Sequence, residues 1–528
     1  MGGRAVILAT VTAGVRRFLT NPGHFANLVL RMPLRGYQVE PLRAILDSIL
    51  RRKGLEFLLI FPRQAGKNEA VAQLLVYLLN LYQRVGGNIV YGAIGDGLGM
   101  GIERLEARLD NPWNAGQWRT RTKPTRRTLG QAAVLFLSSH PQASARGQTA
   151  HHLMVIDETQ DQNGPHIEAV FTPMRASTNA TALYIGTVKL TSDYLWHKKE
   201  ELQRQEARDG QQRVFMVRPE QVTAEVPAYK AFLDAQVKKH GRHHPIVASE
   251  YFLQPIDGTG GLFNERRRAL MRGRHPRQRE PVPGSLYLAT LDVAGEDEAA
   301  TDPIARLSNP ARDYTVGTMF EVSLPGLGGY APGPTYRAVD VFVDHGSKHF
   351  QEVPGRAPLV ERLFAWLDRW QVTHLVADES GVGLGMVSWL QGALGASRVT
   401  GYQFTGSSKA ALGSAFLAVV ETGRFLYWTG DEDQPLSNGW WFWQQVKGCT
   451  YHVPPDGRFD RDLRWEVPAS ARVDTPAGPQ PIHDDRLISA ALVAEADRLY
   501  RSGKLLLGHA VSAVIAATDP LEGTGDVF

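Results

Sequence analysis

Residues 58–69, LLIFPRQAGKNE, constrain the fold of this chain more than any other stretch. An apolar run breaks into a small-residue turn that closes with Gly66 and Lys67, and a segment with helical periodicity follows. A buried strand that feeds such a loop and then a helix aims backbone N–H groups and the positive helix end at an anion, and Lys67 can reach the β- and γ-phosphates of a nucleotide. The usual spacing, G-x-x-x-x-G-K-[ST], has Gly in place of Phe61 and Ser or Thr in place of Asn68. The stretch therefore predicts a phosphate-binding loop, with ordinary turn chemistry as the alternative.

The size and composition of the chain exclude several classes of protein. With 528 residues, 43% of them hydrophobic and 21% charged, it is expected to fold into two or more globular domains. The formal charge of +4 means that contacts with nucleic acid would depend on local basic patches. A single cysteine, Cys449, excludes an internal disulfide and a Cys-based zinc site and fits a reducing cytoplasm. No apolar run approaches the roughly 18–20 residues of a spanning helix, so no membrane partner is expected.

Strand-like and helix-like segments alternate from Leu55 to Gln254. This order predicts a mainly parallel sheet covered by helices, whose ligands sit at the carboxyl ends of the strands, where the Gly66-Lys67 turn falls. The expected strands are Leu55–Phe61, Ile89–Ile94, Ala133–Ser138, Leu153–Asp157 and Ala182–Thr187, and the expected helices are Glu69–Tyr82, Leu98–Leu109, Pro165–Ala176 and Tyr194–Ala207.

A second informative stretch, residues 151–160, has the sequence HHLMVIDETQ. Four apolar residues predict a buried strand, and Asp157 and Glu158 emerge at its end. Asp157 is placed to hold Mg²⁺, directly or through water, and Glu158 to polarise a water toward a γ-phosphate. An apolar strand that ends in two acids is also an ordinary strand exit, but the phosphate-binding loop upstream favours an ATPase.

Other residues of the first half have two interpretations each. Tyr37 could stack on a purine and Gln38 could pair with an adenine edge, or they could simply begin a helix. Arg146, in the loop-like stretch 144–148, could act as an arginine finger, and Arg63 competes for that role. Either arginine could instead lie on the surface or bind DNA. Thr187 ends an expected strand, where it could sense the γ-phosphate.

The character of the sequence changes after Gln254. Residues 257–261, DGTGG, predict a flexible linker, and seven arginines follow between Arg266 and Arg279. Such a run is a solvated face or a surface that follows a phosphate backbone, and the sequence favours neither. A smaller basic cluster, Arg119–Arg127, is expected to be a surface loop of the first domain.

A second alternating region begins at Leu286. Its expected strands are Leu286–Val293, Tyr314–Val322, Arg337–Phe342 and Leu375–Asp378, and its expected helices are Leu359–Trp370, a segment from Lys409 to Gly423, and Arg486–Leu499. The stretch Trp440–Trp443 is expected to be core packing or an interface.

Acidic residues fall at the ends of these elements. Asp292 and Asp378 close strands, and Asp484-Asp485 open a helix. Three carboxylates from separate elements are what a two-metal phosphodiesterase site requires, with two Mg²⁺ or Mn²⁺ ions about 3.5–4 Å apart. Taken singly, these residues could be Asx turns or a helix cap. The order of elements predicts an RNase H-like nuclease fold, with Asp313 and Asp344 as possible extra ligands.

These patterns divide the chain into five parts. They are an N-terminal segment (1–33), a P-loop (RecA/ASCE-like) α/β ATPase domain (34–256), a basic linker (257–283), an RNase H-like nuclease domain (284–505) and a C-terminal tail (506–528). The tail is rich in small residues and could be a docking peptide for a partner.

An ATPase of this type followed by an RNase H-like nuclease resembles the large terminase subunit of tailed double-stranded DNA bacteriophages. The resemblance covers about residues 34–499. Its marks are Tyr37-Gln38, residues 62–68 as a variant Walker A, the Ser-Ala-Arg-Gly of residues 144–147 before Val-Ile-Asp-Glu as Walker B, Ile185-Gly-Thr187 as the coupling motif, Glu250-Tyr251, Asp292, Asp378 with Gly-Val-Gly, and residues 483–487.

The resemblance implies roles for these residues. ATP with Mg²⁺ would be bound by Tyr37, Gln38, Arg63, Gln64, Ala65, Gly66, Lys67, Asn68, Glu69, Asp157 and Thr187. Mg²⁺ would contact Asp157 and Asn68, Glu158 would activate water, and Arg146 would be a finger across a subunit interface. Asp292, Asp378 and one of Asp484 and Asp485 would hold the nuclease metals, with Asp485 favoured and Asp484 capping the helix. Asn68 departs from the usual hydroxyl residue and leaves the metal geometry open.

The resemblance also implies partners and a place of action. The subunit would form a ring, commonly a pentamer, on the portal protein of an empty procapsid, drive double-stranded DNA inward and cut it, together with a small terminase subunit. It would act in the bacterial host cytoplasm, transiently on the procapsid, and be absent from the mature virion. Two alternatives are a helicase-nuclease of DNA repair, which would need a second RecA-like domain, and a non-catalytic DNA-binding scaffold, which would leave the acidic residues unexplained.

Overall fold

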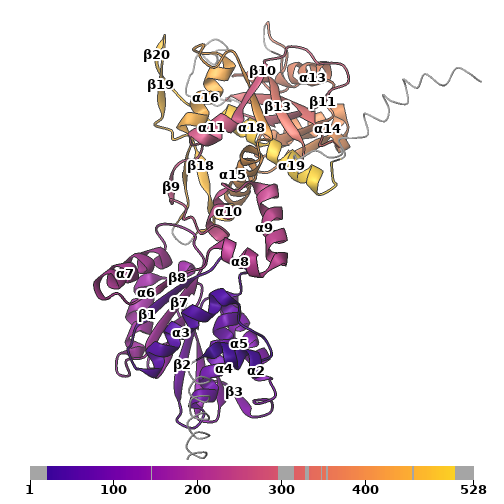
Figure 1. Ribbon diagram of the computed structural model, residues 1–528. Helices are drawn as coiled ribbons and strands as arrows, with labels where there is room; N and C mark the ends of the chain where they lie inside the picture. The colour runs from indigo at the N-terminus through magenta and orange to yellow at the C-terminus, as the bar shows by residue number, and fades with distance from the viewer. Residues whose placement is uncertain are drawn as a thin grey trace, which may run out of the picture. The chain divides into compact units, whose positions relative to one another are not determined.

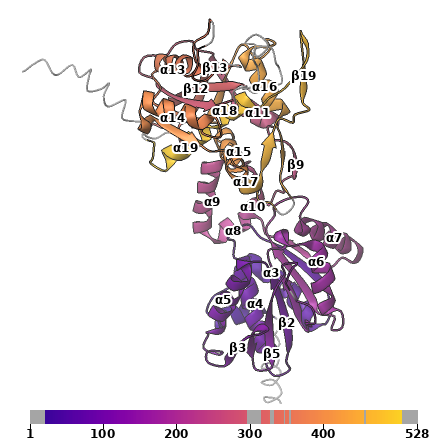
Figure 2. The same ribbon diagram turned by 180° about the vertical axis from the view of Figure 1, so that it is seen from behind.

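The structure, a computed structural model, describes residues 21–143, 145–294, 314–326, 332–345, 348–352, 355–454 and 457–505. It divides into two compact units (Figures 1 and 2). Unit 1 contains the chain up to Ala235 and Pro245–Asp257, and unit 2 contains Gln236–His244 and the chain from Gly258 onward.

Unit 1 is built on an eight-stranded sheet in the order β3-β4-β5-β2-β6-β7-β1-β8. Neighbouring strands from β8 to β5 run parallel, and β4 and β3 add an antiparallel edge. The strand β7 therefore separates β1, which feeds the phosphate-binding loop, from β6, which ends before Asp157. The strands are β1 (Glu56–Ile60), β2 (Gly87–Ala93), β3 (Trp118–Thr122), β4 (Thr125–Leu129), β5 (Ala132–Ser138), β6 (Leu153–Ile156), β7 (Thr181–Gly186) and β8 (Val214–Met216).

Helices cover both faces of this sheet, with α3, α4 and α5 gathered on one side and α7 on the other (Figures 1 and 2). Leu58 and Ile60 of β1 share one apolar core with Leu195 and Leu202 of α7. The helical segments are α2 (Pro22–Leu28), α3 (Gly36–Leu50), α4 (Lys67–Tyr82), α5 (Asp96–Leu109), η1 (Thr159–Asp161), α6 (Gly164–His166), η2 (Ile167–Phe171), η3 (Thr172–Arg175), α7 (Tyr194–Asp209), α8 (Pro219–Glu225), α10 (Pro245–Glu250) and α9 (Pro227–His240), which is shared with unit 2.

The predicted parallel sheet is confirmed, and two edges of it were not predicted. The expected surface loop Arg119–Arg127 is wrong, because these residues form most of the hairpin β3-β4. Its strands consist mainly of Arg and Thr, which are largely exposed in β3 and partly buried in β4, so they lack the apolar alternation that marks a half-buried strand. The three-residue strand β8 is too short to give a periodic signal.

Unit 2 contains a seven-stranded sheet in the order β10-β16-β13-β12-β11-β14-β15. The strands β11, β12 and β13 form an antiparallel meander, and β14 and β15 run parallel to β11. This is the order predicted for an RNase H-like unit, so the predicted fold class is confirmed. The strands are β9 (Thr259–Gly261), β10 (Arg272–Pro276), β11 (Leu286–Asp292), β12 (Thr315–Ser323), β13 (Thr335–Asp344), β14 (His374–Asp378), β15 (Val399–Tyr402), β16 (Phe425–Thr429), β17 (Thr450–His452), β18 (Arg464–Glu466), β19 (Arg472–Thr475) and β20 (Gly478–Pro481).

The helices of unit 2 pack aromatic residues into its interior. As expected for Trp440–Trp443, α16 buries Trp440 and Trp443, and its Phe442 ring stacks on Tyr427 at 3.6 Å between ring centroids. The helical segments are α11 (Glu265–Met271), α13 (Leu359–Arg369), α14 (Gly383–Leu394), η4 (Ala396–Arg398), α15 (Gly406–Glu421), α16 (Asn438–Gly448), α17 (Phe459–Asp462), α18 (Asp485–Ala491) and α19 (Val493–Arg501). The single helix expected over Arg486–Leu499 is thus two helices that meet at Leu492.

The segment expected to be a basic linker is part of unit 2. Its residues form β9, α11 and β10, and β10 pairs with β16 at the sheet edge. Arg266 and Arg267 both bind the Glu421 carboxylate, whose side chain is almost fully buried. Arg266 and Arg267 therefore help to hold unit 2 together. The periodicity of the sequence does not reveal this role.

Among the described residues, no helix has both the length and the apolar composition needed to cross a membrane.

A buried charge cluster of unit 2 joins β13, the residue before β16 and α19. Arg424, 1% exposed, donates to both carboxylate oxygens of Asp497, at 2.5 and 2.9 Å. Tyr336 and Arg501 donate to the same carboxylate, at 3.1 and 2.7 Å. Burial raises the pKa of Asp497, but Arg424 and Arg501 outweigh this effect and lower it. Buried ion pairs of this kind are costly to break, because removal of one member leaves the other charge without compensation.

We therefore expect Asp497→Asn to lower the free energy of unfolding of unit 2 by about 3–5 kcal/mol. Tryptophan fluorescence during urea denaturation measures this, since most of the tryptophans belong to unit 2. Asp460→Asn is the matched control, because Asp460 pairs with Arg458 on the surface of the same unit, and such pairs contribute at most about 1 kcal/mol. Equal losses in the two variants would contradict the role of the buried cluster.

Candidate functional sites

The predicted phosphate-binding loop joins β1 to α4 with the expected geometry. Gln64 and Gly66 have positive φ angles of 62° and 86°, and Gly66 is the N-cap of α4, which begins at Lys67. The loop therefore turns sharply and leaves the free N–H groups of the first turn of a 16-residue helix beside Lys67. This arrangement suits an anion.

Helix α3 holds the loop through its backbone carbonyls. The Tyr37 hydroxyl donates to the Ala65 carbonyl at 2.9 Å, and Gln38 Nε2 donates to the Gly66 carbonyl at 3.0 Å. Gln38 Oε1 accepts from the Arg35 N–H at 2.9 Å, and the Gln38 side chain is buried. Both the oxygen and the nitrogen of the Gln38 amide thus have hydrogen-bond partners within the chain. In this structure Gln38 supports the loop, and its amide is not free to pair with an adenine.

The side chain of Lys67 spans the site to the acidic strand end. Lys67 Nζ lies 3.1 Å from Glu158 Oε2, although Lys67 is only 8% exposed. Glu158 itself has a left-handed backbone with φ of 45°, an uncommon conformation for a non-glycine residue that clusters at functional sites. Burial opposes the charge of Glu158, but Lys67 and a hydrogen bond from Gln160 outweigh it and lower the pKa of this carboxyl. Glu158 is therefore ionised at neutral pH.

Asp157 is buried and held by three donors. Its carboxylate accepts from the Tyr91 hydroxyl at 2.5 Å, from Asn68 Nδ2 at 3.4 Å and from the Glu158 N–H at 2.8 Å. Burial is the largest influence on this carboxyl and raises its pKa. The pKa of Tyr91 is also raised, by burial and by Asp157, so its hydroxyl keeps its proton.

Sequence reasoning missed Tyr91. It lies in β2, in register with Val155 of β6, within an otherwise apolar run. A buried tyrosine hydroxyl usually has a hydrogen-bond partner, so a Tyr in a strand expected to be fully buried is itself a signal that a polar group lies nearby.

Asn68, the unusual residue of the motif, supports the proposal of a cation here. Its Oδ1 atom is buried and accepts no hydrogen bond from the described residues, while its Nδ2 points to Asp157. A buried amide oxygen next to a carboxylate fits Mg²⁺ or one of its waters, because this ion prefers oxygen ligands. The residues present therefore fit the expected Mg²⁺.

The two candidate arginine fingers differ in their surroundings. Arg63 is paired with Glu250 at 2.7 Å, and its backbone N–H donates to the Glu250 carbonyl at 2.8 Å. Arg146 is solvent-exposed in a loop whose Ser144 lies outside the described residues. Arg63 is thus already engaged in holding its own loop. Glu69 is likewise engaged, with Arg108 at 2.8 Å.

A chain of hydrogen bonds leads from Glu158 to Thr187. Gln160 Nε2 donates to Glu158 Oε2 at 2.7 Å, and the Thr187 N–H donates to Gln160 Oε1 at 3.1 Å. The Thr187 hydroxyl in turn donates to the Phe61 carbonyl at 3.1 Å. Gln160, which was not predicted, thereby links the acid at the end of β6 to the residue after β7 and to the start of the loop.

The second candidate site is a cavity of about 280 Å³ in unit 2 that is lined by all four predicted aspartates. Asp292 comes from β11, Asp378 from β14, and Asp484 and Asp485 from the start of α18. Burial, followed by Asp485, Asp378 and Asp484, raises the pKa of Asp292 well above its ordinary value. Carboxylates that destabilise one another in this way are stabilised by a divalent cation, so the residues fit the predicted metal ions.

The two neighbouring acids at α18 behave differently. Asp485 is buried and accepts from the Tyr314 N–H at 3.1 Å. Asp484 occupies the N-cap position, but its side chain makes no capping hydrogen bond and lies 3.5 Å from Lys409 Nζ. Asp484 thus stands at the expected N-cap position of α18, but it does not cap the helix through its side chain. Lys409, which lines the cavity, was not predicted as a site residue.

Of the two extra ligands suggested by the sequence, Asp344 does not line this cavity. Asp344 is paired with Arg356 and with Arg362, the latter at 2.7 Å, and Asp313 lies outside the described residues. No set of three His, Cys, Asp or Glu side chains within the described ranges already has the spacing of a metal site.

No family model matches the chain, and no curated protein matches it. Solved structures that are similar to it include the large terminase of a thermophilic bacteriophage, with 9% identity, a TM-score of 0.43 and coverage of 88% of this chain and 99% of that one. The large terminase of bacteriophage HK97 has 14% identity and a TM-score of 0.38 and covers 88% and 96%. The nuclease of the phage G20c large terminase, solved with bound magnesium, has 16% identity and a TM-score of 0.30 and covers 44% and 96%. At these identities and TM-scores the similarity does not bear on the activity of this chain. Any activity has to be argued from the two candidate sites. The solved structures similar to this chain are thus large terminases of bacteriophages, the family that its motifs resemble.

Proposed function

We propose that this chain is the large terminase subunit of a tailed bacteriophage, which hydrolyses ATP to move double-stranded DNA and cuts that DNA with a metal-dependent nuclease site. The observation that carries the proposal is the presence in one chain of two sites. A phosphate-binding loop stands against Asp157 and Glu158 in unit 1, and four aspartates converge in an RNase H-like unit 2.

In the ATPase unit, the loop N–H groups and Lys67 bind the β- and γ-phosphates, and Asp157 and Asn68 hold Mg²⁺, which would neutralise phosphate charge when bound. When Lys67 turns to phosphate, it releases Glu158, to which it lies at 3.1 Å in the structure. The ionised Glu158 then accepts a proton from the water that attacks the γ-phosphate. Gln160 keeps the Glu158 carboxylate oriented during this step.

In the nuclease unit, Asp292, Asp378 and Asp485 would hold two metal ions, which would supply activation of water and stabilisation of the leaving oxygen. Asp485 is fixed by the Tyr314 N–H and Asp378 by the Ser380 N–H at 2.8 Å, so both carboxylates are oriented in advance. Lys409 beside Asp484 is placed to meet a DNA phosphate.

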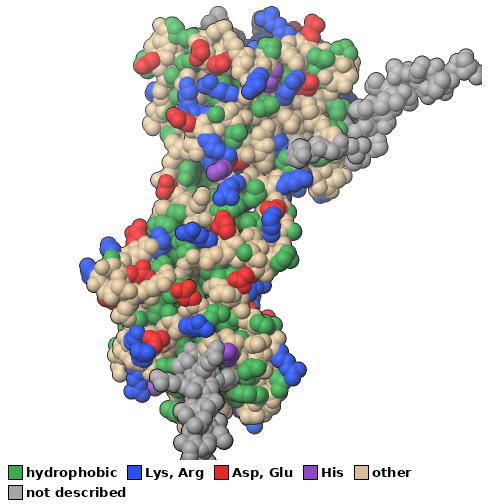
Figure 3. All heavy atoms as spheres, viewed as in Figure 1, with side chains coloured by type: hydrophobic (Ala, Val, Ile, Leu, Met, Phe, Trp, Pro, Cys, Tyr) green, Lys and Arg blue, Asp and Glu red, His purple; other side chains and the backbone are tan. Residues whose placement is uncertain are grey.

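The DNA itself would meet a basic face of unit 2. In Figure 3, Lys and Arg side chains recur on the face that carries α11 and β10. Arg272, Arg274 and Arg279 are exposed there, whereas Arg267 is buried with Glu421. The exposed members of this run are suited to phosphate contacts.

The remaining parts of the proposal concern assembly. The subunit would form a ring, commonly a pentamer, on the portal protein of the procapsid, and would work with a small terminase subunit in the host cytoplasm before release of the mature virion. The exposed Arg146 would reach the ATP site of a neighbouring subunit. The alternative, a repair helicase-nuclease, needs a second RecA-like domain, and the meander β11-β12-β13 of unit 2 does not favour it.

The two activities are expected to separate by mutation. Glu158→Gln removes the proton acceptor and should abolish ATP turnover while metal-dependent DNA cutting remains. Asp378→Asn removes a metal-binding carboxylate and should abolish cutting while ATP turnover remains. Phosphate release and Mg²⁺- or Mn²⁺-dependent nicking of plasmid DNA measure the two activities. Survival of both activities in both variants would refute both site assignments.

Loss of the Tyr91 hydroxyl is expected to weaken the metal-nucleotide site. Tyr91→Phe keeps the ring but removes the 2.5 Å hydrogen bond to Asp157. Partners that orient a metal-binding carboxylate typically contribute about 10–100-fold to metal affinity, so the Mg²⁺ concentration for half-maximal ATPase activity should rise by about tenfold or more. Tyr77→Phe, a buried position on α4 that packs on Phe25, is the control and should leave the Mg²⁺ dependence unchanged.

Replacement of Gln160 is expected to affect turnover more than binding. Gln160→Met keeps the length of the side chain but removes its links to Glu158 and Thr187. We expect kcat for ATP to fall about tenfold with little change in ATP Kd, because the catalytic carboxylate loses its orientation. Gln205→Met makes the same replacement on α7, where Gln205 Nε2 donates to Glu201, and should leave kcat intact. A rise in Kd with constant kcat would assign Gln160 to binding instead.

A further inference from the structure

Arg486, which directly follows Asp485, is a buried arginine without an ion pair among the described residues, and it is only 7% exposed. Its Nη2 atom donates to Asn438 Oδ1 at 3.1 Å, whereas its Nε–H has no hydrogen-bond partner in the described ranges. Burial lowers the pKa of Arg486, and Asp485 is the carboxylate that opposes this effect. A buried cation is costly unless its surroundings compensate it, and the carboxylate beside Arg486 is one of the predicted metal ligands.

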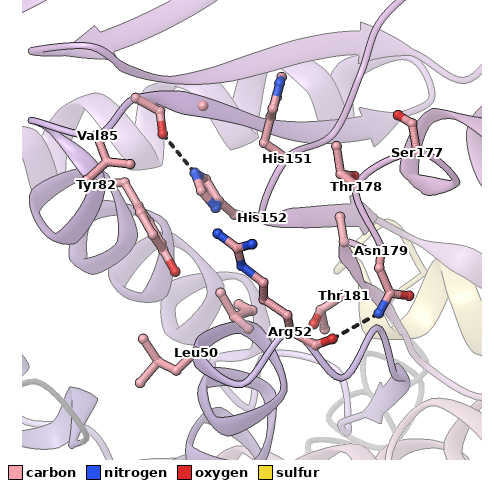
Figure 4. Close-up of a pocket in the computed structure, with 14 residues that line it drawn as sticks. Leu50, Arg52, Tyr82, Val85, His151, His152, Ser177, Thr178, Asn179 and Thr181 are labelled. Atoms are coloured by element: carbon pink, nitrogen blue, oxygen red, sulfur yellow. Dashed lines mark hydrogen bonds between the residues drawn. The ribbon is translucent and has the colours of Figure 1, made fainter.

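An arginine of unit 1 shows the difference that burial makes. In Figure 4 the Arg52 side chain extends into a cavity of about 690 Å³ toward the ring of His152. Arg52 likewise has no ion pair with a described residue, but it is exposed, so water compensates its charge. Water has little access to Arg486, and the protein around it must provide that compensation.

The guanidinium of Arg486 lies over the ring of Tyr314, with 5.4 Å between the guanidinium carbon and the ring centroid. The same ring stacks on His345, with 4.5 Å between ring centroids. Tyr314 precedes β12 and lines the nuclease cavity, and its backbone N–H donates to Asp485 Oδ2 at 3.1 Å. The contacts of the Tyr314 ring therefore help to decide where the donor to Asp485 stands.

The helix start explains how one residue can serve both neighbours. Helix α18 begins at Asp485, and adjacent residues of a helix point about 100° apart. Asp485 thus lines the metal cavity, while Arg486 reaches Tyr314 and Asn438, the first residue of α16. Arg486 therefore joins the start of α18 to α16 and to the entrance of β12, and it does so directly behind a metal-binding carboxylate.

We propose that Arg486 is a positioning residue of the nuclease site, which holds the Tyr314 ring and so keeps the Tyr314 N–H on Asp485. The inference rests on the proposed function of unit 2. Without the guanidinium, the Tyr314 ring loses one of its two stacked neighbours, and the Asp485 carboxylate is less well oriented for metal. Metal binding is then weaker, but metal at saturating concentration draws the carboxylate back into place, so the maximal rate of cutting changes little.

The first test is calorimetric titration of the full chain with Mn²⁺ in the absence of DNA, with Asp378→Asn to identify the heat that belongs to the nuclease site. Arg486→Met should raise the Kd for Mn²⁺ about tenfold, and Tyr314→Leu, which keeps the backbone N–H but removes the ring, should do the same. Tyr314 is only partly buried, so its replacement tests the contact even if Arg486→Met unfolds the unit. Arg472→Met is the control, because Arg472 is exposed and donates to backbone carbonyls, and its Kd should stay unchanged. An unchanged Kd in Tyr314→Leu or in folded Arg486→Met would overturn the proposal.

The second test combines the two replacements. Arg486→Met and Tyr314→Leu in one chain should weaken Mn²⁺ binding no more than either alone, because they interrupt the same series of contacts, and additive losses would overturn the proposal. In plasmid nicking, the half-saturating Mn²⁺ concentration of Arg486→Met should rise about tenfold, with the maximal rate within about twofold. A lower maximal rate with unchanged Mn²⁺ dependence would also overturn it. If the unsubstituted chain shows no metal-dependent nicking, the proposed function fails instead, and the calorimetric result alone decides the role of Arg486.

Discussion

The contact between Lys67 and Glu158 is the interaction on which the first site depends. The two residues are 91 positions apart, and they meet only because the sheet places β1 and β6 on either side of β7, with the carboxyl ends of all three strands at one edge. A cation at the helix start thus holds the acid to which the proposed function assigns the activation of water. In that proposal, arrival of a phosphate would give Lys67 a stronger partner and free Glu158, so substrate binding and activation of the base would be one event.

The surroundings of the loop make this exchange specific. Tyr37 and Gln38 fix the loop carbonyls from α3, and Glu250 fixes Arg63 from α10. With the backbone held on both sides, the side chain of Lys67 is the part that is able to move. Any change at Glu158 is then felt first by Gln160, whose amide joins it to Thr187. If Thr187 has the predicted coupling role, the physical route is this pair of hydrogen bonds through Gln160, the first of which a rotation of Glu158 would break.

Much of this arrangement can be predicted from the sequence. The rest cannot, and the reasons are physical. Apolar runs ending in Asp157 or Asp378 reveal both the strand and the acid at its end, because parallel strands gather their carboxyl ends at one edge. Hydrogen-bonded partners such as Tyr91, Gln160 and Lys409 have no periodic signature, since their roles depend on which element lies next to them. For the basic run after Gln254 the sequence favours neither a solvated face nor a surface for phosphates, and Arg267 is neither, because only the fold supplies its buried partner Glu421.

The two sites differ in their balance of charge. In unit 1 the acids Asp157 and Glu158 already face a cation, Lys67, so the site is balanced until the negatively charged phosphates draw Lys67 away. In unit 2 Asp292 faces three other carboxylates with only Lys409 nearby among the described residues that line the cavity, and the pKa of Asp292 is raised accordingly. Such a cluster gains stability from any divalent cation that enters it, before DNA arrives. Under the proposed function, the first site would therefore respond to its anionic substrate and the second to metal, and this difference would let one chain control movement and cutting separately.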